Sequence, residues 1–358
     1  MTSTNADESS DAGAATAGPA GVDVERVTAW LAERAPIEAP LSFDLIAGGH
    51  SNLTFRVTDA TGHRWVLRRP PLHQVLASAH DMSREHKIIA ALAPTDVPVA
   101  PVVGLCQDEA VNGAPFYVME HVDGLVVRDI NVAQGLSEQQ RRAAGISTIE
   151  TLARIHAVDV DAVGLGDLGK KEDYIARQLK RWHGQFEKSK TREVPVVDEV
   201  HDALAELIPE QGPAAIVHGD YRLDNCMIDD DGQVIAVLDW EICTLGDPLA
   251  DVGLLLVYSP DNDMAAATGL PAATSLPGFP NQREMLEQYA AISGRDLSHI
   301  DYYVAFGYWK LACIIEGVYA RYVGGAMGDR GDASSFDFFG QQVIDIAERA
   351  RDAVARVR

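Results

Sequence analysis

The sequence predicts an α+β chain in two parts, a small antiparallel sheet followed by a larger, mostly helical region. Residues 41–120 contain short segments of alternating apolar and polar residues, as half-buried strands do, with one helical segment among them. Beyond residue 125 apolar residues recur mainly at helical spacing. A length of 358 residues is sufficient for two packed cores. We therefore expect a disordered tail at 1–21, a first lobe at 22–120, a hinge at 121–125 and a helical second lobe at 126–358.

The composition argues against several kinds of partner. Apolar residues make up 47% and charged residues 23% of the chain, which is typical of a globular protein. The net charge of −23 disfavours binding to nucleic acid or to an anionic membrane through the overall field. The four cysteines show no C-x-x-C spacing, and the first residues lack the pattern of a signal peptide. We expect a cytoplasmic protein, and the sequence leaves its oligomeric state open.

In the first lobe, helical spacing of apolar residues predicts a helix that begins near Val22. A second helix is predicted over 82–92. Alternation of apolar and polar residues predicts five strands, at 41–46, 53–57, 64–69, 97–105 and 116–120. These elements would form the small sheet with its inserted helix.

In the second lobe, helix starts are marked by capping boxes at Ser137 with Gln140 and at Asn281 with Glu284. Further helices are expected around 174–186, 301–322 and 336–356. The apolar stretch 302–319 contains Lys310 and Glu316, so we interpret it as a buried helix rather than a membrane span.

The segment 217–241, VHGDYRLDNCMIDDDGQVIAVLDWE, places Asp220, Asn225 and Asp239 among short apolar runs. An Asp-Gly turn between CMI and QVIAVLD predicts a hairpin. Asn225 precedes its first strand and Asp239 ends its second, so the hairpin is expected to bring these two side chains together. A carboxylate beside an amide oxygen suits Mg²⁺, and Asp220 can then face a substrate hydroxyl.

The pattern H-G-D-x-x-x-x-N, followed fourteen residues later by Asp, resembles the catalytic and metal-binding segment of the aminoglycoside phosphotransferase family. The longer stretch HGDYRLDN…VIAVLDWEICTLGDPLADVG is similar to the kinase-like domain that some acyl-CoA dehydrogenases carry at their N-terminal end. The resemblance runs from about residue 40 to the C-terminal helices and implies the two-lobed protein-kinase-like fold. It also implies that Asp220 is catalytic, that Asn225 and Asp239 bind Mg²⁺, and that ATP (or GTP) is the co-substrate.

The family has a cation on the third strand that pairs with the nucleotide phosphates. The matching position here is Arg68, where kinases usually have Lys, and an arginine can still bridge phosphate and carboxylate. Glu85 shares a helix face with apolar residues, where a carboxylate is costly unless it is paired. We expect Arg68 to be its partner, with a solvent-reaching Glu85 as the alternative.

The resemblance places the remaining nucleotide contacts in two segments. A turn between the first two strands, whose backbone N–H groups could cover phosphates, contains Gly49, His50, Ser51 and Asn52. The interlobe hinge, whose backbone would hold adenine, contributes Glu120 and Val122.

Three other residues near the motif are interpreted as structural. In the kinase-like pattern His218 packs beneath the metal-binding Asp. Asp247 with Pro248 is expected to start a helix as N-cap and N1. Asp251 either interacts with the dipole of that helix or braces the motif loop.

Residues 170–192 are basic although the whole chain is acidic, since they include eight Lys or Arg and only three Asp or Glu. One interpretation is a solvated helix face with a mobile loop. The other is an anion site on the substrate side, which would suit a phosphorylated carrier such as coenzyme A and would repel a polycationic aminoglycoside.

Together these features predict a kinase that transfers the γ-phosphoryl group of ATP to a hydroxyl of a small molecule. We favour a hydroxyacyl-CoA-type acceptor over an aminoglycoside-like one, with a separate acyl-CoA dehydrogenase as a functional partner. The departure at Arg68 keeps a nucleotide-binding pseudokinase as an alternative. A hydrolase using His218 is disfavoured because neither a G-x-S-x-G nor an H-E-x-x-H motif is present.

Overall fold

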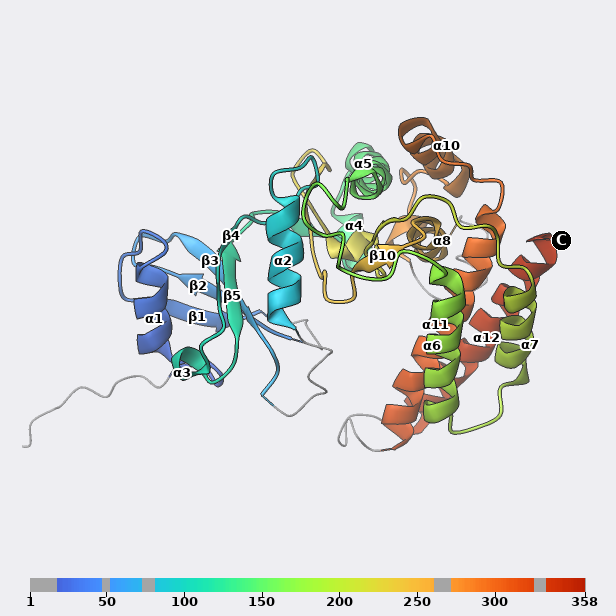
Figure 1. The fold of residues 1–358 in the computed structure, drawn as a ribbon, viewed down its shortest axis with the longest axis horizontal. Helices are drawn as coiled ribbons and strands as arrows, with labels where there is room; N and C mark the ends of the chain where they lie inside the picture. Colours follow the sequence, from blue (N-terminus) through green and yellow to red (C-terminus); the bar gives the residue numbers. More distant parts are fainter. Residues whose placement is uncertain (1–17, 47–51, 73–80, 261–271, 325–332, 358) are drawn as a thin grey trace, which may run out of the picture. The chain divides into compact units, whose positions relative to one another are not determined.

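The computed structural model describes residues 18–46, 52–72, 81–260, 272–324 and 333–357, and it contains two compact units (Figure 1). Unit 1 comprises Met1–His86 and Val102–His121, and unit 2 comprises Lys87–Pro101 and Val122–Arg358. The last boundary between the units lies after His121, at the start of the expected hinge. Residues 87–101, which the sequence analysis assigns to the first lobe, belong to unit 2. The expected tail lies largely outside the described residues.

Unit 1 is built on a five-stranded antiparallel sheet in the order β1-β2-β3-β5-β4. Its strands are β1 (Ser42–Leu45), β2 (Leu53–Thr58), β3 (Arg64–Arg69), β4 (Val102–Cys106) and β5 (Phe116–Glu120). Its helices are α1 (Val24–Ala32), the first turns of α2 (Met82–Leu92) and the short α3 (Glu109–Asn112). The two predicted helices and the strands predicted at 41–46, 53–57, 64–69 and 116–120 are confirmed. The strand predicted at 97–105 begins only at Val102, because the prolines at 98 and 101 cannot donate to a strand ladder, and α3 was not predicted.

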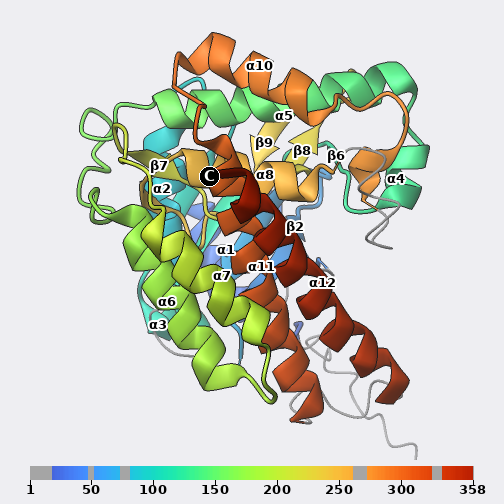
Figure 2. The ribbon, with the colours of Figure 1, turned by 90° about the vertical axis from the view of Figure 1, so that its right-hand side faces the viewer.

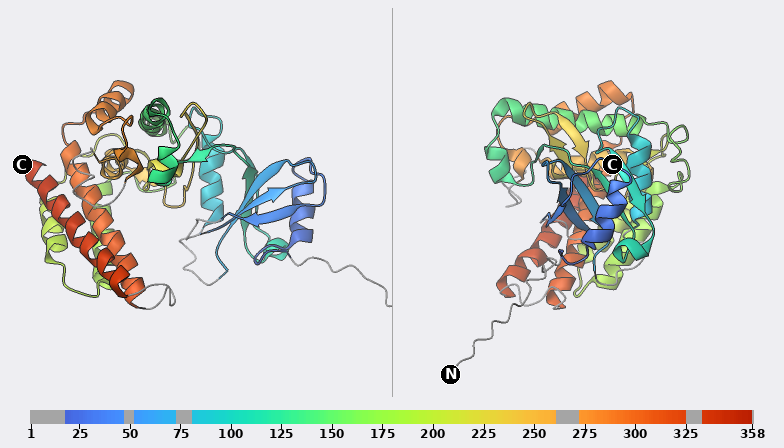
Figure 3. Two further views of the ribbon diagram at one scale, coloured as in Figure 1. Left: turned by 180° about the vertical axis from the view of Figure 1, so that it is seen from behind. Right: turned by 90° about the vertical axis from the view of Figure 1, so that its left-hand side faces the viewer.

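The core of unit 1 lies between α1 and one face of the sheet (Figure 3). Val27, Trp30 and Leu31 form the buried face of α1. The Trp30 ring meets the Phe116 ring of β5 edge-on, with centroids 4.9 Å apart. Strands β3 and β5, which carry Arg68 and Glu120, pair directly, with Arg68 opposite Tyr117 and Trp65 opposite Glu120.

Unit 2 contains two small antiparallel sheets, β6-β8-β9 and β10-β7, among helices. The strands are β6 (Leu125–Val126), β7 (Ala215–Val217), β8 (Cys226–Ile228), β9 (Val234–Val237) and β10 (Thr244–Gly246). The helices are α4 (Ile130–Gln134), α5 (Glu138–Ala157), α6 (Tyr174–Ser189), α7 (Pro195–Glu206), α8 (Leu249–Tyr258), α10 (Gln282–Ser293), α11 (Ile300–Val323) and α12 (Ala333–Val357), with short 3₁₀ turns at Leu223–Asn225 and Ala273–Ser275. Both predicted capping boxes are present. The α+β fold class is confirmed.

Helix α11 is the central helix of unit 2 and packs against α6, α7, α8 and α12 (Figure 2). It is apolar on nearly all sides because helices surround it. Its buried Glu316 pairs with Arg192, whose Nη2 lies 3.3 Å from Oε2. Among the described helices, none is both long and apolar enough to cross a membrane.

Helices α8 and α11 approach closely at Gly253. A methyl group added there would overlap the backbone of Tyr303 on α11. The approach lets the Tyr303 hydroxyl reach Asp247, just before α8, with 2.6 Å between Oη and Oδ2. Glycine at 253 is therefore a packing requirement for the helix pair that supports the motif loop.

We expect Gly253→Ala to lower the free energy of unfolding by about 1–3 kcal/mol, because the added methyl must push α8 from α11. This cost opposes the gain of about 1 kcal/mol that alanine normally brings to a helix interior. Gly184→Ala in α6 is the matched control, because a methyl there meets nothing within 4 Å and should stabilise. Urea unfolding of both variants checks this, and a stabilised Gly253→Ala protein would contradict the close approach.

Candidate active site

The candidate site is built on the loop 218–225, which connects β7 to the β8–β9 hairpin in unit 2. Strand β7 is buried and pairs with β10, so the start of the loop is fixed in the core. Gly219 adopts a φ of 87°, a left-handed conformation that favours glycine and turns the chain away from the strand. The loop ends in a 3₁₀ turn at Leu223–Asn225.

The structure brings Asp220 and Asn225 into direct contact. Nδ2 of Asn225 donates to the Asp220 carbonyl at 2.8 Å and to Asp220 Oδ2 at 3.1 Å. Arg222 Nε lies 3.5 Å from the same Oδ2, and Arg222 Nη1 lies 3.0 Å from Asp224 Oδ2. No described residue hydrogen-bonds to Oδ1 of Asp220, so that oxygen is the one left to accept a proton or a hydrogen bond.

The predicted hairpin is confirmed, and it carries Asp239 back towards Asn225. Cys226 pairs with Val237 in the β8–β9 ladder, and the Leu238 N–H donates to the Asn225 carbonyl at 2.9 Å. Asp239 has a φ of 62°, which is uncommon for a residue other than glycine. Such backbone strain persists only where surrounding structure imposes it and concentrates at functional sites.

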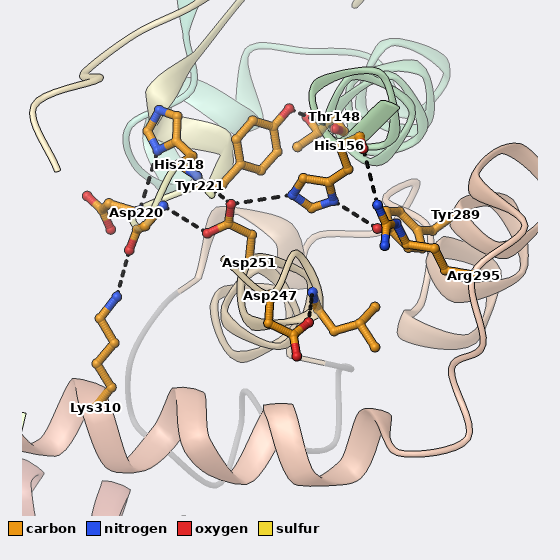
Figure 4. A network of polar contacts seen from close by, with 12 residues as sticks. Thr148, His156, His218, Asp220, Tyr221, Asp247, Asp251, Tyr289, Arg295 and Lys310 are labelled. Atoms are coloured by element: carbon orange, nitrogen blue, oxygen red, sulfur yellow. Dashed lines mark hydrogen bonds and ion pairs between the residues drawn. The ribbon is translucent and has the colours of Figure 1, made fainter. Parts of the chain in front are cut away.

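Asp251 on α8 holds the start of the loop (Figure 4). Its buried carboxylate accepts the N–H of His218 at 2.6 Å and that of Gly219 at 2.9 Å. Of the two roles left open for Asp251 by the sequence, the structure shows the bracing one. The expected helix start is displaced by one residue, because Pro248 itself is the N-cap of α8 while the Asp247 carboxylate accepts the Leu249 N–H.

His218 is structural, as the sequence predicts. Its Nε2 lies 2.9 Å from the Leu238 carbonyl oxygen and donates to it, while Nδ1 faces the N–H of Asp220 at 3.4 Å. The imidazole therefore connects the loop to the residue before Asp239. Together with the Leu238 contact to Asn225, it fixes the three candidate residues relative to one another.

A second buried histidine lies behind Asp251. His156 Nδ1 accepts from the Tyr289 hydroxyl at 2.8 Å, and its Nε2 lies 3.5 Å from Asp251 Oδ2 (Figure 4). Burial lowers the pKa of His156, and the neighbouring Asp251 only partly opposes this. Burial acts to raise the pKa of Asp251, but the contacts from His156, His218 and Gly219 lower it below its usual value.

Two functional candidates were missed by sequence reasoning. Lys310 on α11 is buried and donates from Nζ to the Gly219 carbonyl at 2.7 Å, one residue before Asp220. Burial lowers the pKa of this ammonium, while Asp251 and Asp220 act to raise it. Arg222 is the other. A signal existed for Lys310, because a lysine inside an apolar helix must have a polar partner, but the sequence does not identify the partner.

In unit 1 the expected ion pair is present. Arg68 Nε on β3 lies 3.2 Å from Glu85 Oε1 on α2, and both side chains are largely buried. Asn52 is buried at the start of β2, and Glu120 at the end of β5 pairs with His63, with 3.0 Å between Oε2 and Nε2. Gly49, His50 and Ser51 lie outside the described residues, and Val122 is half-buried.

The residues of the loop and hairpin fit a magnesium ion. Because Nδ2 of Asn225 is turned towards Asp220, the amide oxygen faces the other way. This oxygen and the Asp239 carboxylate are hard oxygen donors, the type that Mg²⁺ prefers.

Comparison with known proteins agrees with this architecture. A family model described as "Phosphotransferase enzyme family" matches residues 42–287. The chain belongs to this family. The crystal structure of a candidate aminoglycoside phosphotransferase from Ralstonia eutropha JMP134 has a TM-score of 0.78 and 33% sequence identity, covering 94% of this phosphotransferase-family chain and 99% of the other. The match confirms the expected kinase-like fold.

Mouse (Mus musculus) acyl-CoA dehydrogenase family member 10 is 36% identical over 277 residues, which cover 76% of this chain. The chain spans only 26% of the length of that relative. The ternary complex of aminoglycoside phosphotransferase APH(4)-Ia with AMP-PNP and hygromycin B has a TM-score of 0.59 at 17% identity, covering 92% of this chain and 97% of the other. That likeness shows a shared fold.

We expect stability to fall as the pH drops below about 6.5, the ordinary pKa of histidine. The pKa of His156 is lower in the folded state than in the unfolded state, so as the pH falls the unfolded state binds the proton first. Proton binding then stabilises the unfolded state relative to the folded state until the pH reaches the folded-state pKa. One such group contributes at most about 1.4 kcal/mol per pH unit. Urea unfolding at pH 7.5 and 5.5 should show a smaller loss for His156→Gln than for the wild type.

The His156→Gln protein should also be less stable at pH 7.5, because a buried hydrogen-bonded side chain is replaced. His86, whose pKa burial also lowers, titrates in both proteins and cancels in the comparison. Equal pH slopes in the two proteins would show that His156 is not held neutral.

Proposed function

We propose that the chain is an ATP-dependent kinase that phosphorylates a hydroxyl of a small-molecule substrate. The observation that carries the proposal is the convergence of Asp220, Asn225 and the end of the β8–β9 hairpin within one hydrogen-bonded unit. In phosphoryl transfer the protein mainly positions groups and neutralises charge. A carboxylate beside a set of magnesium ligands is suited to that task.

In this proposal each residue has a separate task. Asp220 accepts a hydrogen bond from the acceptor hydroxyl through Oδ1, while Asn225 and Arg222 hold Oδ2 and so orient the carboxylate. Asn225 and Asp239 would hold Mg²⁺, which supplies charge neutralisation for the phosphates. As the phosphoryl group leaves ATP for the hydroxyl oxygen, the hydroxyl proton passes to Asp220.

Unit 1 would supply the nucleotide contacts. Glu85 holds the guanidinium of Arg68, which leaves a fixed, permanently charged fork to meet phosphate oxygens. Asn52 and the backbone at Glu120 and Val122 are proposed as further contacts, as the family resemblance implies. ATP is the preferred co-substrate, with GTP as the alternative to be tested by competition.

For the acceptor we propose a hydroxyacyl-CoA-type compound rather than an aminoglycoside-like one. The support is the 36% identity to a relative named as an acyl-CoA dehydrogenase family member, together with the basic residues of 170–192, which would repel a polycationic aminoglycoside. An acyl-CoA dehydrogenase acting on the same acyl chain would then be a functional partner. Transfer of label from γ-labelled ATP to hydroxyacyl-CoA compounds and aminoglycosides distinguishes the two classes.

Asp220→Asn should lower the turnover number by about 10²–10⁴, the usual contribution of a positioned acid–base group. The substitution is nearly isosteric, so ATP·Mg²⁺ binding and the thermal unfolding midpoint should stay close to wild type. Label transfer from γ-labelled ATP measures the loss. Asp231→Asn, at an exposed position in the β8–β9 turn, is the control and should keep full activity.

A loss of less than about tenfold in Asp220→Asn would remove Asp220 from this role. If the wild type binds ATP but transfers no label to any acceptor, the pseudokinase alternative motivated by Arg68 is supported instead.

Asp239→Asn should raise the Mg²⁺ concentration needed for half-maximal turnover by at least about tenfold, because a charged ligand is replaced by a neutral one. Asparagine also tolerates the left-handed backbone at this position. A magnesium titration of turnover, and of the thermal shift with AMP-PNP, provides two readouts. An unchanged magnesium requirement in both would exclude Asp239 as a ligand.

A further inference from the structure

One face of α6 is a continuous basic surface. Residues at i, i+3, i+4, i+7, i+8 and i+11 share a helix face, and here they line an open hollow of about 820 Å³: Arg177, Lys180, Arg181, Gly184, Gln185 and Lys188. The opposite face carries Ile175, Leu179 and Phe186 and is buried against unit 2. We call the six residues the α6 basic face.

The charges of this face are not neutralised by the protein. None of Arg177, Lys180, Arg181 and Lys188 has a carboxylate within ion-pair distance among the residues that the structure describes. Nearby lysines differ, since Lys171 pairs with Asp161. In a chain with a net charge of −23, four unpaired cations on one side of one helix form a local attractive site for anions.

Two further details describe the α6 basic face. Gly184 lies in the helix interior, where glycine is unfavourable, yet an added methyl would meet nothing within 4 Å. Packing within the protein therefore does not require glycine there, and the position leaves the middle of the hollow open. Arg177 is held in place at one end, because its Nη2 donates to the Lys170 carbonyl.

The face is connected to the candidate active site through a single aromatic ring. The Arg181 guanidinium lies 5.5 Å from the centroid of the Trp182 ring, and the Lys310 ammonium lies 5.4 Å from the same centroid. Lys310 Nζ donates to the Gly219 carbonyl, next to Asp220. The N-terminal turn of α6 also packs on β10, where Tyr174 leaves room only for glycine at Gly246.

We propose that the α6 basic face binds the phosphate groups of the acceptor substrate, at the end of the substrate remote from its reacting hydroxyl. The anion site is inferred from α6 alone. That its ligand is the acceptor substrate rests on the proposed kinase function. Phosphate groups are the chemistry that matches clustered Arg and Lys donors with an open approach. An acceptor without phosphates would leave these four cations unused.

The test uses the full chain and coenzyme A, which carries a diphosphate and a ribose phosphate at one end. Isothermal titration calorimetry measures its affinity without nucleotide. We expect Lys180→Glu/Arg181→Glu to weaken coenzyme A binding at least about tenfold, because two charge-assisted contacts become repulsive. Pantetheine, which shares the thiol arm but has no phosphate, should not bind measurably to either protein.

Two variants separate a site from a general charge effect. Arg283→Glu/Arg351→Glu changes the net charge equally at exposed positions of α10 and α12 and should keep coenzyme A affinity within about twofold of wild type. Gly184→Gln adds an uncharged side chain to the middle of the hollow and should weaken binding without lowering the thermal midpoint. The proposal is overturned if the two charge variants lose coenzyme A affinity equally. It is also overturned if the Gly184→Gln protein and the Lys180→Glu/Arg181→Glu protein both keep wild-type affinity.

A second comparison distinguishes the α6 basic face from the nucleotide site. Arg68→Gln should weaken ATP binding and keep coenzyme A binding, whereas Lys180→Glu/Arg181→Glu should do the opposite. Coenzyme A binding that is lost only in Arg68→Gln places it in the nucleotide site and ends the inference. Asp220→Asn should bind coenzyme A as the wild type does. If coenzyme A binds to the α6 basic face but no phosphoryl transfer is found, the anion site is supported and only the proposed kinase function is wrong.

Discussion

The candidate site depends on one buried carboxylate. Asp251 accepts two consecutive backbone N–H groups, those of His218 and Gly219, at the point where the chain leaves β7. Burying a charge is costly unless every lone pair finds a donor, so this carboxylate strongly selects the one loop conformation that supplies those donors. From that fixed start, His218 reaches the Leu238 carbonyl and Leu238 returns to Asn225. The relative positions of Asp220, Asn225 and Asp239 thus follow from a closed circuit of hydrogen bonds.

Helix α11 supports this circuit from the other side, which explains the polar groups on an otherwise apolar helix. Lys310 donates to the Gly219 carbonyl, and Tyr303 donates to Asp247 at the start of α8. The close approach of α8 at Gly253 brings Tyr303 into range. Lys310 and Asp251 therefore bind the same two-residue segment through its carbonyl and its N–H groups. Because Asp251 binds the N–H groups of His218 and Gly219 and Lys310 binds the carbonyl of the next peptide unit, the backbone just before Asp220 is fixed from both of its polar sides.

Much of the fold follows from local patterns, because alternation and helical spacing are properties of neighbouring residues. The hairpin between Asn225 and Asp239 was predictable in this way, since its Asp-Gly turn and its two short strands are contiguous in the sequence. The pairing of Arg68 with Glu85 was predictable from the family resemblance and from the cost of an unpaired carboxylate. The partner of Lys310 was not, because ninety-one residues separate it from Gly219 and only the packing of α11 brings them together. Arg222 was overlooked because its position two residues after Asp220 says nothing about the direction of its side chain.

The two faces of α6 show why net charge alone does not determine which ligands a protein accepts. Exposed charges separated by more than about 8–10 Å are largely screened at physiological ionic strength, so the overall charge of −23 acts weakly at any one point on the surface. Cations one helical turn apart act together on a bound group at contact distance, where screening is least effective. The acidic remainder of the chain then disfavours non-specific binding of polyanions, while the α6 basic face retains a local attraction. An acidic protein can in this way select a small phosphorylated ligand and still reject nucleic acid.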